Sequence, residues 1–119
     1  MAPVLRAYLA RMDSEHPEQA LDLLVPDFQF LIALPGREAR GTSRDDFAAY
    51  IAGRAAVDRV HEVLRATADG DLETVYGVVT ESGRTVGSFL SAAAVTPDGH
   101  LARYQSFFTT TFDLVDRPA

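Results

Sequence analysis

Few residues of this chain could take part directly in chemistry, and the three histidines are the first candidates for a general base or a metal ligand. His16 stands directly before Pro17, and His100 follows a Pro-Asp-Gly turn sequence. Both are therefore expected in solvated loops, because proline and glycine in these positions favour turns. His61 differs from the other two because it lies in a segment that predicts a strand.

His61 is followed immediately by Glu62, so either side chain could supply a base from this strand. Adjacent strand residues face opposite sides of a sheet, so the two cannot form a direct pair. The alternation inferred for the sheet predicts that Glu62, and not His61, faces the helices. No His-x-Glu or paired-histidine spacing is present, so no metal site is expected.

The clustered acids have structural explanations, with one exception. Asp45 and Asp46 follow a serine that can cap a helix, and acids stabilise the first helical turn. Asp69-Gly70-Asp71 is typical of a hairpin turn. Glu73 is the strand acid whose alternation matches an inward position, but it lies close to that turn. Its carboxylate is therefore expected either inside the fold, as a candidate base, or in solvent.

Composition excludes several classes of protein. The 119 residues are 47% hydrophobic and 24% charged, which predicts one folded domain over residues 1–119. The absence of cysteine excludes disulfides and cysteine nucleophiles. A net charge of −6 argues against a nucleic-acid partner. No apolar run approaches the roughly 18 residues of a membrane span, so no membrane partner and a cytoplasmic location are expected.

Glycine motifs that bind nucleotides, and the Gly-x-Ser-x-Gly motif of serine hydrolases, are missing from the sequence. No cofactor is therefore expected.

Three helical segments are predicted in the first half of the chain. Apolar residues at helical spacing predict a first helix over residues 4–13. Pro17 suits the first turn of a second helix, which Pro26 ends. Ser43 is a suitable cap for a third helix that fades over residues 53–56.

Strand patterns occupy the remaining segments. Residues 28–34 are nearly all apolar, which predicts a strand covered on both faces. Four further strands are predicted over residues 60–68, 72–80, 85–95 and 101–114, joined by tight-turn sequences. Helices followed by an antiparallel meander define an α+β domain in which three N-terminal helices pack on one face of a curved, mainly antiparallel sheet.

This order of elements resembles the nuclear transport factor 2-like superfamily, and in particular its ketosteroid isomerase and SnoaL-like polyketide cyclase branches. The resemblance covers essentially the whole chain and rests on short segments in the right order. These segments are Ala7–Asp13, Leu23–Phe28, Gly41–Phe47, Leu64–Asp69, Ser82–Arg84 and Pro97–Leu101. It implies a cone-shaped barrel that encloses a pocket for a small, mostly apolar molecule, and a homodimer formed through the outer sheet face.

The resemblance also implies site residues. It places Tyr8 at the position of the tyrosine that donates to the developing oxyanion in ketosteroid isomerases, which use an Asp base. The position of that base falls on Ile32, and the position of the protonated acid falls on Ser91. Isoleucine cannot accept a proton, so the isomerase mechanism is not expected. SnoaL-like cyclases use polar groups on the late strands, where Arg103 and Gln105 are the nearest polar residues.

Strand alternation then predicts the lining of the pocket, with Tyr8 and Ser91 as the candidate catalytic residues. The other lining residues share inward positions on strands or a helix. They are Phe30, Ile32, Tyr50, Val75, Gly77, Val79, Tyr104, Ser106 and Phe108. The alternative is an ordinary packed core in which the tyrosine hydroxyls bond to one another.

Two functions follow. The first is a small-molecule-binding barrel that acts as an isomerase, cyclase or hydratase on a hydrophobic, polycyclic or polyketide-like substrate. The second is a ligand-binding or dimerisation module without chemistry of its own. For dimerisation, the strand alternation places Thr74, Tyr76, Val78 and Thr80 on an outer face that a partner sheet could cover.

Overall fold

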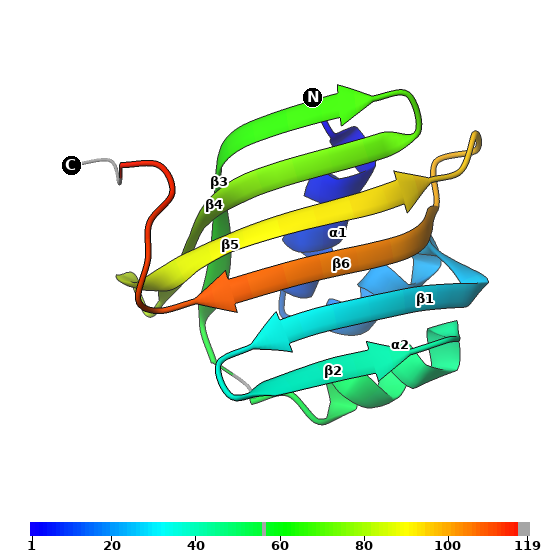
Figure 1. Cartoon of the computed structure of the whole chain (residues 1–119). Coiled ribbons are helices and arrows are strands. Elements are labelled where there is room, and N and C mark those ends of the chain that lie inside the picture. The colour runs from blue at the N-terminus through cyan, green and yellow to red at the C-terminus, as the bar shows by residue number, and fades with distance from the viewer. Residues whose placement is uncertain (56, 117–119) are drawn as a thin grey trace.

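A six-stranded sheet with helical segments on one face forms the molecule, as seen in a computed structural model (Figure 1). The structure describes residues 1–55 and 57–116. Ala56, at the end of the predicted third helix, lies outside the described residues.

The sheet has the strand order β2-β1-β6-β5-β4-β3. Its strands are β1 (Leu24–Leu34), β2 (Arg37–Gly41), β3 (Arg59–Asp69), β4 (Leu72–Glu81), β5 (Arg84–Val95) and β6 (Leu101–Thr109). Only the β1–β6 pair among these is parallel, and the other pairs are antiparallel. The predicted α+β class and mainly antiparallel sheet are confirmed.

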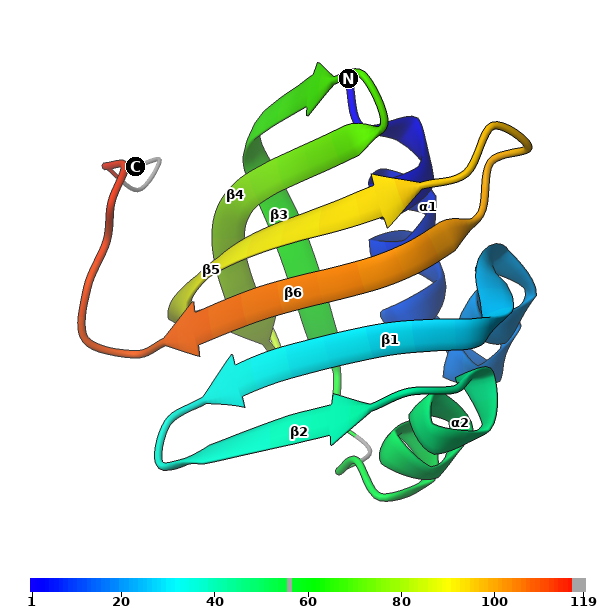
Figure 2. The ribbon, with the colours of Figure 1, turned by 45° about the vertical axis from the view of Figure 1, so that its right-hand side comes forward.

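The helical segments are α1 (Pro3–Met12), a 3-10 helix η1 (Pro17–Leu23) and α2 (Arg44–Ala52). In Figure 2, α1 lies behind β5 and β6, and α2 lies next to β1 and β2. As predicted, Ser43 caps α2, since its Oγ accepts from the Asp46 amide at 3.0 Å. The second helical segment begins at Pro17 as predicted, but it is a 3-10 helix and ends at Leu23 rather than at Pro26, since β1 already begins at Leu24.

The sheet bends toward α1 (Figure 2). The β3–β4 register shifts between Val63 and Arg65, which leaves Leu64 as an extra residue in β3. Such a bulge increases local bending and reverses the alternation of side chains on either side of it. Gly77 of β4 permits the close approach, since a Cβ atom there would collide with the Glu62 carbonyl oxygen.

An aromatic cluster, consisting of Phe28, Phe30 and Phe47, fills the space between β1 and α2. The Phe47 ring meets the other two edge-on, with ring centres 5.5 Å from Phe28 and 5.0 Å from Phe30. Phe28 and Phe47 are fully buried. Edge-to-face packing at these distances stabilises a core beyond its buried area.

Two further expectations were wrong, and one strand was not predicted. β1 is covered on one face only, because its buried residues alternate with half-buried or exposed ones. β2 was not predicted as a strand, because its sequence, Arg-Glu-Ala-Arg-Gly, is polar and has no apolar alternation. β6 ends at Thr109 rather than Leu114.

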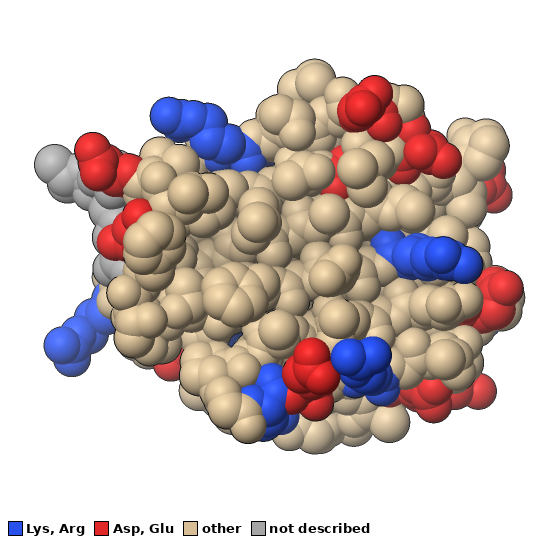
Figure 3. All heavy atoms as spheres, in the orientation of Figure 1, with Lys and Arg blue, Asp and Glu red and all other residues tan. Residues whose placement is uncertain are grey.

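The segment after β6 folds back over the outer face of the sheet instead. The Ser88 hydroxyl donates to the Phe112 carbonyl oxygen at 2.6 Å, and the Leu114 amide donates to the Tyr76 hydroxyl at 2.6 Å. Tyr76 and Val78, predicted on the exposed outer face, are buried. Figure 3 shows this face, where charged groups surround a largely uncharged centre.

None of the helices in the described part of the chain has the length and apolar character needed to cross a membrane.

Candidate functional site

A cavity of about 380 Å³ lies between the helices and the inner face of the sheet, beside the aromatic cluster. This volume falls within the usual range for small-molecule sites, about 300–1,000 Å³. Apolar side chains from α1, α2 and four strands line most of it. Its wall contains Tyr8, Leu9, Met12, Ile32, Leu34, Arg37, Ala49, Tyr50, Gly53, Arg54, Ala55, Arg59, His61, Val79, Glu81, Phe89, Tyr104, Ser106 and Phe108.

The structure brings most of the predicted lining residues to this wall. Those present are Tyr8, Ile32, Tyr50, Val79, Tyr104, Ser106 and Phe108. They come from both helices and from β1, β4 and β6, and the predicted alternation along β6 places its three members on the same side.

Four predicted residues lie elsewhere. Phe30 belongs to the aromatic cluster, and Val75 is fully buried in the hydrophobic core. Gly77 faces the backbone of β3 at close range, so it has no room to line a cavity. Ser91 is buried outside the wall, and its hydroxyl bonds to two residues that line the cavity, Tyr104 and Ser106.

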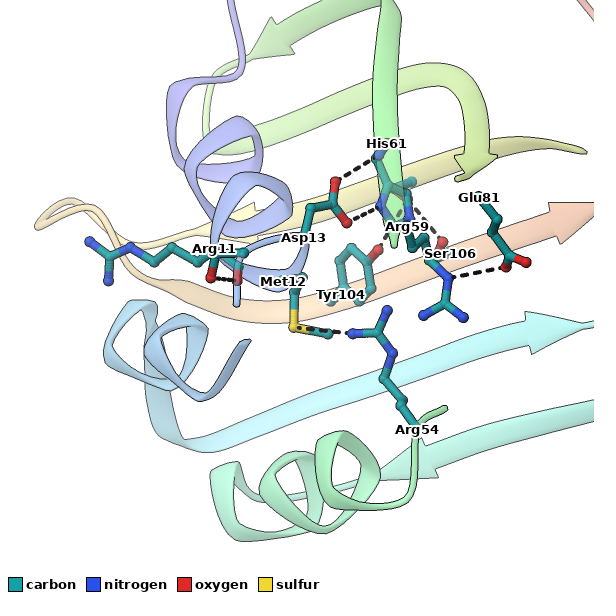
Figure 4. Close-up of polar contacts among 11 residues, drawn as sticks. Arg11, Met12, Asp13, Arg54, Arg59, His61, Glu81, Tyr104 and Ser106 are labelled. Carbon is teal, nitrogen blue, oxygen red and sulfur yellow. Dashed lines mark hydrogen bonds and ion pairs between the residues drawn. The ribbon is translucent and has the colours of Figure 1, made fainter. Parts of the chain in front are cut away.

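The strongest polar contact at the cavity joins Asp13 and His61, which sequence reasoning did not pair. The His61 ring nitrogen Nδ1 lies 2.7 Å from Asp13 Oδ1, and the His61 backbone amide donates to Asp13 Oδ2 at 2.6 Å. Figure 4 shows both contacts. The Phe89 ring packs edge-on against the imidazole, with centres 4.9 Å apart. The imidazole is therefore fixed in place from two sides.

This arrangement selects one form of the imidazole. An ionised carboxylate only accepts hydrogen bonds, so Nδ1 of His61 donates to Asp13 and carries a proton. In the neutral ring, Nε2 is then the nitrogen that can accept a proton. Because His61 lines the cavity, Asp13 orients a potential general base toward any molecule bound there.

The bulge at Leu64 explains why the predicted orientation of this strand was wrong. After the bulge in the sequence, Ala66 packs against the core. If side chains alternated without a break from Ala66 back to Glu62, Glu62 would face inward. The extra residue reverses the alternation, so that His61 faces the cavity and Glu62 is exposed. One signal in the sequence did point to Asp13. It ends α1 as its C-cap, where a negative charge is unfavourable to the helix dipole and needs compensation.

Hydroxyl groups also lie at the cavity, close to the Asp13–His61 pair (Figure 4). The Ser91 hydroxyl bonds to Tyr104 at 3.1 Å and to the Ser106 hydroxyl at 2.9 Å. The rings of Tyr8 and Tyr104 lie 4.9 Å apart. Burial is the main cause that raises the pKa of Tyr8 well above its ordinary value and also raises the pKa of Tyr104. Both phenols therefore stay protonated at neutral pH.

The remaining sequence candidates lie away from the cavity. Glu73 is buried, but its carboxylate accepts from the Leu5 amide at 2.8 Å and so satisfies the N-terminus of α1. Arg103 and Gln105 line an open groove on the outer face. His16 and His100 pair with nearby acids in connecting segments.

The described residues contain no cluster of three or more histidines and acids that could hold a metal ion.

Solved structures with the same fold include a candidate ketosteroid isomerase from Kribbella flavida. It is 24% identical, with a TM-score of 0.75 over 99% of this chain and 90% of the other. A candidate polyketide cyclase from Sinorhizobium meliloti is 20% identical, with a TM-score of 0.68 over 89% of this chain and 94% of the other.

A third is a protein of ketosteroid isomerase-like fold from Catenulispora acidiphila, solved in complex with trimethylamine. It is 15% identical, with a TM-score of 0.74 over 89% of this chain and 85% of the other. By sequence, no family model and no curated protein matches the chain. The chain therefore shares its fold with ketosteroid isomerase-like and SnoaL-like proteins.

Proposed function

We propose that the cavity binds a small, mostly apolar molecule and that His61, oriented by Asp13, moves a proton on it. The protein would act as an isomerase, cyclase or hydratase on a hydrophobic, polycyclic or polyketide-like substrate that carries a carbonyl or hydroxyl group. The cavity would be the open end of the cone-shaped barrel implied by the resemblance, with the aromatic cluster at its closed end.

A single observation carries this proposal: an imidazole bonded to a carboxylate at 2.7 Å lines a mostly apolar cavity that is also lined by Tyr8 and Tyr104. His61 Nε2 would accept the proton from a carbon next to the substrate carbonyl. The electron pair of that C–H bond then forms an enolate, whose oxygen receives a hydrogen bond from Tyr8 or Tyr104. Return of the proton to another atom completes an isomerisation.

The base and the oxyanion donor would each accelerate the reaction substantially. General base catalysis by a positioned side chain contributes about 10²–10⁴-fold to a rate. A preorganised donor to a developing oxyanion contributes about 10²–10³-fold. Ser91 would act as a positioning residue, since it lies outside the cavity wall and its hydroxyl bonds to those of Tyr104 and Ser106.

Deuterium exchange tests the proposal without knowledge of the natural substrate. The bicyclic ketone α-tetralone is incubated with the protein in deuterated water, and loss of the α-proton signal is followed by NMR. We expect exchange above the buffer rate and its loss, by about 10²-fold or more, in His61→Gln. His100→Gln is the matched control, because His100 also pairs with an acid, Asp98, at 3.3 Å but lies outside the cavity.

Equal exchange by wild type and His61→Gln would contradict the role of His61. Saturable binding of the ketone without any exchange would instead support a ligand-binding module without chemistry of its own.

We also propose that two copies of the chain associate through the outer sheet face. This face has a largely uncharged centre (Figure 3), and it exposes Leu90 of β5 and Phe107 of β6. An exposed apolar patch of this kind favours association. Sedimentation at micromolar concentration should give a dimer, and Phe107→Arg should give a monomer with an unchanged fold. A monomeric wild type would contradict the proposal.

A further inference from the structure

One end of the cavity wall gathers positive charge. Arg37 begins β2, Arg59 begins β3, and Arg54 follows the end of α2. All three belong to the wall of the cavity. β2 and β3 begin at the sheet end where β1 and β4 finish, since Arg37 pairs with Leu34 and Arg59 pairs with Glu81. We call Arg37, Arg54 and Arg59 the arginine rim.

The arginine rim is incompletely neutralised. Glu81 is the one carboxylate on the cavity wall among residues 1–55 and 57–116, and its Oε2 lies 3.6 Å from Nε of Arg59. Within the same residues, no acid lies within ion-pair distance of Arg37 or Arg54. The chain as a whole carries a net charge of −6, so this local excess of positive charge runs against the overall composition.

Arg54 is the best-placed member for ligand binding. Its guanidinium carbon lies 5.9 Å from the centre of the Tyr50 ring, and its Nη1 lies 3.9 Å from the Met12 sulfur. Figure 4 shows the side chain extending from the end of α2 toward Met12 and Tyr104. An aromatic ring and a thioether hold a guanidinium without consuming its charge, and the planar group can then bind a carboxylate through two parallel hydrogen bonds.

We propose that the natural ligand is an amphiphilic carboxylate whose anionic group binds Arg54 and Arg37 at the rim. This assignment rests on the proposed function, because it names the substrate class of the same cavity. The apolar body of the ligand contacts Ile32, Leu34 and Phe108, and its reacting carbon lies at His61. Arg54 and Arg59 are half-buried, whereas Arg37 is exposed. Charges interact more strongly away from bulk water, so Arg54 should contribute more to the attraction than Arg37.

A pair of probes of equal shape tests the charge preference. The probes are 2-naphthylacetate, an anion, and 2-naphthaleneethanol, its neutral counterpart. Their fluorescence is followed during titration with the protein, which contains no tryptophan to interfere. We expect the anion to bind about tenfold more tightly than the alcohol at low salt.

The variants Arg54→Gln and Arg37→Gln should each weaken binding of the anion by up to about tenfold and leave binding of the alcohol unchanged. Arg65→Gln is the control, because Arg65 is exposed on β3 and lies outside the cavity wall. Circular dichroism spectra verify that each variant is folded, and either arginine variant alone suffices for the test.

The outcomes separate the two proposals. Equal affinity of the two probes, or equal weakening of both in the arginine variants, overturns the carboxylate assignment and leaves the apolar cavity intact. Failure of wild type to bind either probe overturns both the assignment and the proposed function.

Discussion

The space between the helices and the sheet has two halves that differ in how they are used. In one half, the aromatic cluster of Phe28, Phe30 and Phe47 fills the volume with edge-to-face packing. In the other half, a cavity of about 380 Å³ remains, lined partly by polar groups. The comparison teaches that one packed half can provide stability while the other half leaves room for a ligand.

The two ends of α1 repeat this contrast. At its N-terminus, Glu73 accepts from the Leu5 amide at 2.8 Å, a contact that satisfies the helix end. At its C-terminus, Asp13 holds His61 at 2.7 Å, and His61 lines the cavity. An acid therefore has a structural role at one end of α1, and another acid orients a potential base at the other end.

The largest effect should come from emptying the packed half. Phe47→Ala removes a fully buried ring that contacts Phe28, Phe30, Tyr8 and Tyr50. We expect the free energy of unfolding to fall by about 3–5 kcal/mol, measured by urea denaturation. A loss below about 1 kcal/mol would show that this half is not tightly packed.

A matched pair on β4 compares a fully packed core position with a position at the cavity. Val75 is fully buried in the core, whereas Val79 lines the cavity. Val75→Phe should lower the free energy of unfolding by about 1–3 kcal/mol through overpacking. Val79→Phe should change stability by less than about 1 kcal/mol, because its ring can enter the cavity, and should abolish binding of the naphthalene probes. Equal destabilisation by the two variants would contradict the existence of the cavity.

The smallest expected effect on stability comes from the tyrosines that line the cavity. Burial raises the pKa values of Tyr8 and Tyr104 above the ordinary value of 10.0. Their contribution to stability is therefore complete below about pH 10 and is lost as the pH rises toward the folded-state pKa values. Urea midpoints should fall as the pH rises above about 10, and less so in Tyr8→Phe. The same fall in Tyr8→Phe would show that Tyr8 does not contribute.

Much of the fold was predictable because local patterns encode it. The strands over residues 60–68, 72–80 and 85–95 lie within one residue of β3, β4 and β5, since alternation and tight-turn residues define them. β2 was not predictable from apolar alternation, because it is a polar edge strand that pairs only with β1. The early end of β6 depends on contacts from Phe112 and Leu114 to distant residues.

The candidate site also has a part that the sequence predicted and a part that it did not. Alternation along single strands correctly placed Tyr104, Ser106 and Phe108 on one side of β6, the side that lines the cavity. Alternation failed for His61, because one extra residue at Leu64 reverses every position on the far side of the bulge.

The sequence by itself determined the class of fold and the apolar character of the interior, because periodicity and turn chemistry act over a few neighbouring residues. Only the tertiary structure decided which polar groups meet. Asp13 and His61 are separated by 48 residues along the chain, and the arginine rim joins the ends of β2, α2 and β3. Such meetings depend on the register and curvature of the whole sheet, which no local pattern specifies.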